Sequence, residues 1–247
     1  MARPSARWAV AGAAIAAELA GAAAWVALAQ PPGFARLLAR QRVVLVAVPT
    51  TRRAVAVTID DGPHEQLTPE LLSVLERHGA RATFFLLGSG VERMPSLAQA
   101  VVDGGHEVGN HGWLDRPAVL TSRGAFGRDL RRTAAVVLAA TGRRPRFVRP
   151  GSGWFRPVHL REVRDAGYEL ALGSVAVLDL LVRDLDRDVA FVVDRLQPGA
   201  VLVLHEGRAE RAGVVPLLDR VLTAAKERGY EAVTLSELVG VGSAAEG

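Results

Sequence analysis

The stretch "AVAVTIDDGPH", residues Ala54–His64, joins an apolar run to a polar end. Its first six residues are continuously apolar or β-branched, which predicts a buried strand. The strand ends in two adjacent carboxylates, Asp60 and Asp61, followed by a Gly-Pro pair. Neighbouring like charges repel, so the pair needs an explanation. One is a solvated turn, since Asp-Gly-Pro favours turns. The other is a site where one carboxylate holds a metal and its neighbour handles a proton.

Composition narrows the possible sites. The chain has 247 residues, 49% of them hydrophobic, and no cysteine. A sizeable core is therefore expected, while disulfides, thiolate metal sites and cysteine nucleophiles are excluded. Any metal site must use histidine and carboxylate ligands.

Arginine carries most of the positive charge. The net charge is +4, and Lys226 is the sole lysine. Arginines gather between Arg123 and Arg149, either as a surface for anionic polymers or phospholipid headgroups, or as a solvated helix face. Aromatic residues do not alternate with them, so we expect no nucleic-acid partner. The sequence does not indicate an oligomeric state.

The first thirty residues predict export. Arg3 and Arg7 precede an apolar run from Trp8 to Ala29. Its length suits a membrane span, and "ALA" at Ala27–Ala29 also resembles a signal-peptidase site. We therefore expect residues 1–30 to be a signal peptide or an N-terminal membrane anchor, or otherwise a buried helix of the domain. Either export interpretation gives an extracytoplasmic protein, secreted or anchored to the membrane.

Strands and helices alternate over the rest of the chain. After a lead-in at 31–49, we expect one domain over 50–240 and a flexible tail at 241–247. Thr68 is expected to cap the first helix, and the last strand is expected within 231–238. Strands are predicted at 54–59, 83–87, 106–111, 146–149, 168–175 and 200–206, with helices at 68–79, 96–104, 122–142, 157–167, 186–199 and 214–229. This α/β pattern predicts a parallel sheet covered by helices, as a barrel or a doubly wound sheet.

Polar side chains follow several of these strands. Active sites of parallel α/β folds form where the carboxyl ends of strands meet. The residues at or just after such ends are Asp60, Asp61, His111, Arg149, Asp179 and His205. His111 and Asp115, four residues apart, could also point at one metal ion. The set favours a functional site over a solvated turn at Asp60 and Asp61.

Five motifs in order resemble the polysaccharide deacetylases of the NodB-homology type, carbohydrate esterase family 4. They cover most of the chain from Ala54 to Leu238. The motifs are "TIDDGP" at 58–63, "NHGWLD" at 110–115, "RPGSG" at 149–153, "SVAVLDL" at 174–180 and "LVLHE" at 202–206. The resemblance implies a distorted or incomplete (β/α) barrel that removes N-acetyl groups from a chitin-like or peptidoglycan-like glycan.

The resemblance also implies roles for single residues. Asp60 would be the general base and His205 the general acid, with Arg149 orienting Asp60 and Asp179 orienting His205. A backbone N–H near Ser152 would stabilise the oxyanion. One divalent metal ion, zinc before manganese, cobalt or nickel, would be held by Asp61, His111 and Asp115.

The chain departs from the family pattern at three places. Asp115 replaces the usual second histidine, which makes a harder, more negative site, unless water fills that position. The third motif lacks its tyrosine, and Leu180 replaces a tryptophan. Trp113 and Trp154 are candidates for stacking against a sugar ring, or for packing at the rim. A metal-dependent amidase acting on a small non-sugar amide, and a catalytically silent glycan-binding module, therefore remain as alternatives.

Overall fold

The computed structural model describes residues 44–153, 155–177 and 184–244. Several predictions fall outside these residues: the N-terminal hydrophobic helix, residues 31–43 of the lead-in, Trp154, Asp179, Leu180 and the end of the tail. Within the described part, no helix has both the length and the apolar character needed to cross a membrane.

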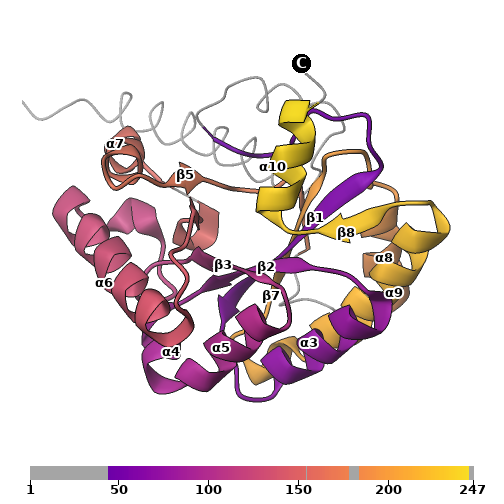
Figure 1. Cartoon of the computed structure of the whole chain (residues 1–247), viewed down its shortest axis with the longest axis horizontal. Helices are drawn as coiled ribbons and strands as arrows, with labels where there is room; N and C mark the ends of the chain where they lie inside the picture. Colours follow the sequence, from indigo (N-terminus) through magenta and orange to yellow (C-terminus); the bar gives the residue numbers. More distant parts are fainter. Residues whose placement is uncertain (1–43, 154, 178–183, 245–247) are drawn as a thin grey trace, which may run out of the picture.

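All strand pairs of the sheet are parallel, as predicted. The order is β5-β4-β3-β2-β1-β7-β6, and β8 pairs with the first residues of β1. The sheet forms an incomplete barrel (Figure 1). The strands are β1 (Ala54–Gly62), β2 (Ala82–Leu86), β3 (Glu107–Asn110), β4 (Phe147–Val148), β5 (Glu169–Leu170), β6 (Val175–Ala176), β7 (Val201–His205) and β8 (Glu231–Val233).

Most helices cover the outer face of this sheet. Figure 1 shows α6, α4, α5, α3 and α9 along one side of the strands and α10 on the other. The helices are α3 (Leu67–His78), α4 (Gly88–Arg93), α5 (Pro95–Asp103), α6 (Arg123–Thr141), α7 (Pro157–Asp165), α8 (Leu185–Val193), α9 (Val214–Glu227) and α10 (Leu235–Ala244). Short 3₁₀ turns η1 (Ala118–Leu120), η2 (Gly151–Gly153) and η4 (Ala209–Arg211) lie in loops after β3, β4 and β7.

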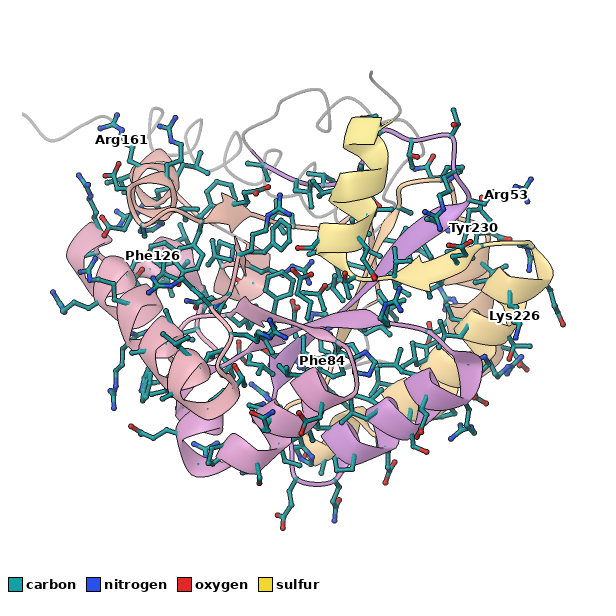
Figure 2. The ribbon with its side chains drawn as sticks, in the orientation of Figure 1. Arg53, Phe84, Phe126, Arg161, Lys226 and Tyr230 are labelled. Carbon is teal, nitrogen blue, oxygen red and sulfur yellow. The ribbon has the colours of Figure 1, made fainter. Side chains whose placement is uncertain are left out.

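The two faces of β1 belong to different clusters of the core, because side chains alternate along a strand. Val55, Val57 and Ile59 pack with the outer helices. Ala54 and Ala56 pack instead with Phe85, Phe147 and Leu235 inside the sheet. Continuing the alternation, Thr58 and Asp60 face the inside near the end of the strand. Figure 2 shows Phe84 in the interior, while Arg161 and Lys226 project outward.

Several element boundaries differ from the predicted ones. Val46, Ala47 and Val48 are buried, and Leu45 bridges to Ala171, so residues 44–48 of the predicted lead-in pack onto the domain. Apolar side chains in this stretch explain the difference. α10 follows β8 directly and extends beyond residue 240, where a tail was expected.

The arginine-rich stretch mostly forms ion pairs with neighbouring carboxylates. Arg123 and Arg131 contact Glu162, and Arg146 contacts Glu169. These pairs support the interpretation as a solvated helix face over that of a surface for anionic polymers.

Candidate active site

Arg149 and Asp60 form a buried ion pair at the inner edge of the sheet. Nη1 of Arg149 donates to Oδ1 of Asp60 at 2.6 Å and to the Thr58 hydroxyl at 2.7 Å. Its other nitrogens donate to the carbonyl oxygens of Ala171 and Leu172. The guanidinium also lies 4.2 Å from the centre of the Phe85 ring. Four acceptors therefore fix Arg149, and Arg149 fixes the Asp60 carboxylate.

His205 lies beside Asp60 on the adjacent strand. The two residues are register partners of β7 and β1. The backbone N–H of Glu206 donates to the carbonyl of Asp60 at 2.9 Å. This bond continues the pairing of the two strands past their last register partners, Asp60 and His205. His205 is half-buried. The two residues predicted as base and acid are thus neighbours at one edge of the sheet.

A bulge separates the directions of the two adjacent carboxylates. The pairing of β1 with β2 shifts between Asp60 and Gly62. Asp61, the residue between them, has φ of 71°, a conformation that aspartate tolerates better than most residues. Asp60 meets Arg149, whereas Asp61 meets Arg211. The repulsion between the neighbouring charges is therefore offset by two separate arginines.

Asp61 and His111, two of the three predicted metal ligands, lie in contact. Nε2 of His111 lies 3.2 Å from Oδ1 of Asp61, and its Nδ1 lies 2.9 Å from the carbonyl oxygen of Arg149. With Nδ1–H donating to that carbonyl, a protonated ring donates Nε2–H to Asp61, and a neutral ring presents the lone pair of Nε2 there. Both side chains are buried, at 4% and 7% exposure.

The charges around this pair shift its pKa values. Burial would raise the pKa of Asp61, but the hydrogen bonds and charges of His111 and Arg211 hold it well below its usual range. Burial would lower the pKa of His111, but the carboxylates of Asp60 and Asp61 raise it.

The Asp61–His111 pair fits two ligand positions of a divalent metal ion. Oδ1 of Asp61 is buried and faces Nε2 of His111, while Oδ2 is taken by Arg211. Ligand atoms about 2.0–2.1 Å from a tetrahedral zinc ion lie roughly 3.3 Å apart. The 3.2 Å between Oδ1 and Nε2 is close to that spacing.

Asp115 does not join this pair. It is exposed in the loop after β3, and its Oδ2 lies 3.2 Å from Nη2 of Arg208. Across the described ranges, no three His, Cys, Asp or Glu side chains come together as a possible metal site. The structure thus brings together two of the three predicted ligands and holds the third on an arginine.

Comparisons with known proteins identify the family of the chain. The sequence matches the family model described as Polysaccharide deacetylase over residues 47–171. The chain belongs to the polysaccharide deacetylase family. The peptidoglycan-N-acetylglucosamine deacetylase of Bacillus cereus is 31% identical, over 78% of this chain and 91% of its own length.

Solved structures of the CE4 polysaccharide deacetylase family confirm the predicted fold. A peptidoglycan N-acetylglucosamine deacetylase, Bc1960, has a TM-score of 0.78 at 26% identity, covering 85% of this chain and 97% of that one. A CE4 family pseudoenzyme from Bacillus anthracis has a TM-score of 0.74 at 26% identity, covering 80% and 69%. The predicted family, incomplete barrel and hydrolase class are confirmed.

Glu206 is a buried carboxyl group beside this site, which the sequence analysis did not single out. Its Oε2 accepts from the Thr68 hydroxyl at 2.6 Å, and its Oε1 has no partner among the described residues. A Cβ at Gly62 would lie 1.9 Å from Oε1, so any larger residue there would force Glu206 to move. Burial raises the pKa of Glu206 to about 8. The hydrogen bond from Thr68 opposes this shift, and the charge of Asp61 adds to it.

The prediction that Thr68 caps α3 is therefore wrong. The N-cap is Gln66, and the Thr68 hydroxyl bonds instead to Glu206 and to the N–H of His64. The signal for Glu206 was its position directly after the apolar run "VLVLH". Arg211 carried no such signal, since its contact with Asp61 joins residues 150 positions apart.

The predicted substrate contacts lie at the rim. Ser152, in η2, has φ of 58°, is exposed, and donates its hydroxyl to the carbonyl of Gly151. The Trp113 ring is covered by the guanidinium of Arg132 at 3.3 Å, and its other contacts include Gly88. These contacts support rim packing for Trp113 over sugar stacking.

Proposed function

We propose that this protein is a metal-dependent hydrolase that removes N-acetyl groups from an N-acetylated sugar of a cell-envelope polysaccharide, chitin-like or peptidoglycan-like. The observation that carries the proposal is the placement of Asp60, held by Arg149, next to His205 on the adjacent strand. The peptidoglycan deacetylase named above supports the choice of substrate class.

Asp60 and His205 would divide the proton transfers. Asp60 takes a proton from the attacking water as its oxygen bonds to the acetyl carbon. Arg149 holds the carboxylate in position for this step. His205 donates a proton to the nitrogen as the C–N bond breaks, which releases acetate and a free amine. A backbone N–H near Ser152 would stabilise the oxyanion.

Asp61 and His111 would hold the divalent ion, with zinc before manganese, cobalt or nickel. Their two buried donor atoms 3.2 Å apart support this assignment. When bound, the ion supplies positive charge that polarises the acetyl carbonyl. Asp115 would join these ligands only after its ion pair with Arg208 breaks. The orienting role of Asp179 and the sugar contact of Trp154 remain predictions.

An envelope substrate also fits the predicted N-terminal export segment. We propose an extracytoplasmic protein, secreted or attached to the membrane by residues 1–30.

The test is acetate release from peptidoglycan fragments and chito-oligosaccharides. We expect release by the metal-loaded protein, and a decrease of about 10²–10⁴-fold in Asp60→Asn with its metal content retained. Asp103→Asn, in an exposed position on α5, is the matched control. Hydrolysis of simple amides alone would support the small-amide alternative. Glycan binding without hydrolysis, with metal loaded, would support the silent module.

A further inference from the structure

The segment after β7 supplies one arginine to each of the two carboxylates predicted as metal ligands, Asp61 and Asp115. Nη1 of Arg211 bonds to Oδ2 of Asp61 and donates to the carbonyl of Glu206 at 3.0 Å. Nη2 of Arg208 lies 3.2 Å from Oδ2 of Asp115. The segment passes directly over Asp61: at Gly207, with φ of 78°, a Cβ would lie 2.7 Å from the Cβ of Asp61.

The two ion pairs differ in burial. Arg211 and Asp61 are each 7% exposed, whereas Arg208 and Asp115 are 57% and 36% exposed. Solvent screens exposed ion pairs, which contribute little, while a buried pair is strongly coupled. Arg211 is therefore the arginine that matters for the charge of the site.

We propose that Arg211 is an internal cation that neutralises Asp61 and competes with a divalent metal ion for it, so that it lowers the metal affinity of the protein. The inference rests on the proposed function, because it assigns Asp61 to the metal site. Arg211 takes Oδ2 and leaves only Oδ1 facing His111 Nε2. A cation bound by Oδ1 would therefore share the single carboxylate of Asp61 with Arg211.

Arg211 has two opposing effects on such a cation. By fixing the Asp61 carboxylate it orients a ligand, and orienting partners of this kind are worth about 10–100-fold in metal affinity. By its charge it repels a divalent ion a few ångströms away in a buried site, where Coulomb interactions are far stronger than in water. The charge effect is the larger, since it acts on two unit charges of the ion. Removing Arg211 should therefore tighten metal binding.

The test is the zinc affinity of the full-length protein after chelator treatment, measured by isothermal titration calorimetry. We expect Arg211→Met to bind Zn²⁺ at least about tenfold more tightly than wild type. Arg220→Met is the matched control, since Arg220 pairs with Asp186 at the surface, and its affinity should equal that of wild type. Equal or weaker binding by Arg211→Met would overturn the inference and leave the proposed function intact.

Two further outcomes separate the inference from the proposed function. Binding by Arg211→Met alone, without binding by wild type, would support the inference in its strongest form. Absence of binding by both would overturn the inference together with the proposed metal role.

Thermal unfolding covers the case in which the variant is unstable. Zn²⁺ should raise the Tm of Arg211→Met more than that of wild type, because the ion replaces the missing charge. A variant that stays unfolded even in Zn²⁺ would overturn the inference, since Arg211 would then serve the fold itself.

Discussion

Nη1 of Arg149 lies 2.6 Å from Oδ1 of Asp60, and both side chains are at most 4% exposed. Removing one partner of a buried ion pair leaves the other charge without compensation, which costs about 3–5 kcal/mol. We therefore expect Arg149→Met to lower the free energy of unfolding by about that amount, as measured by urea denaturation. Because Arg149 also positions Asp60, deacetylation should fall as well.

The control for this prediction is Arg52→Met. Arg52 pairs with Glu231 at the surface, where both side chains are more than half exposed. Arg52→Met should change the free energy of unfolding by no more than about 1 kcal/mol. A similar loss in both variants would show that the burial of the Arg149–Asp60 pair is not what matters.

His205 offers a test that depends on the leaving group. A general acid matters most when the leaving group is a poor one, such as an amine. His205→Asn should lower the hydrolysis of N-acetyl sugars by about 10²–10⁴-fold. The same substitution should lower the hydrolysis of an aryl acetate ester much less, because a phenolate leaves without a proton. His78→Asn, on α3, should leave both rates unchanged, and an equal loss on both substrates would rule out the acid role.

Glu206 should make stability depend on pH. In the folded protein its pKa is about 8, compared with an ordinary value of 4.5. Between these values the folded protein keeps a proton that the unfolded chain has lost. Stability is therefore fully present below about pH 4.5 and declines as pH rises toward 8, by roughly 3–5 kcal/mol in total.

Glu206→Gln isolates this contribution. Glutamine can still accept from Thr68 but carries no titratable proton, so the variant should lose this decline and exceed wild type in stability at pH 8. Urea unfolding at pH 5.5 and pH 8 measures the difference. Glu227→Gln, at an exposed position in α9, should keep the wild-type pH dependence. Parallel curves for wild type and Glu206→Gln would contradict the prediction.

Local patterns predicted most of the fold, because the strands of this sheet are short apolar runs between well-marked helices. The alternation also predicted that Asp60, His111, Arg149 and His205 would gather at one edge, since parallel strands end together. The inner-face position of Asp60 follows from the same period of two along β1.

The contacts that sequence reasoning missed all join distant segments through side chains. Arg211 with Asp61, Arg208 with Asp115 and Thr68 with Glu206 are each separated by more than 90 positions. No local period encodes such a pair. The spacing of His111 and Asp115 suggested a shared metal ion, but spacing alone could not show that a third segment supplies an arginine to Asp115.

Gly109 tests how tightly the inner core is packed. A Cβ at this position of β3 would lie 2.5 Å from the Phe85 ring, which itself supports Arg149. Overpacking of this kind costs about 1–3 kcal/mol, so Gly109→Ala should lower the free energy of unfolding by that amount. Gly124→Ala is the control in α6, where the nearest atom to the new Cβ would be 3.5 Å away. Alanine is the better helix former, so this variant should be unchanged or more stable by up to about 1 kcal/mol in urea denaturation. If Gly109→Ala were as stable as wild type, the Phe85 ring would have to move. The position of Arg149 beside Asp60 would then not depend on the packing of Phe85.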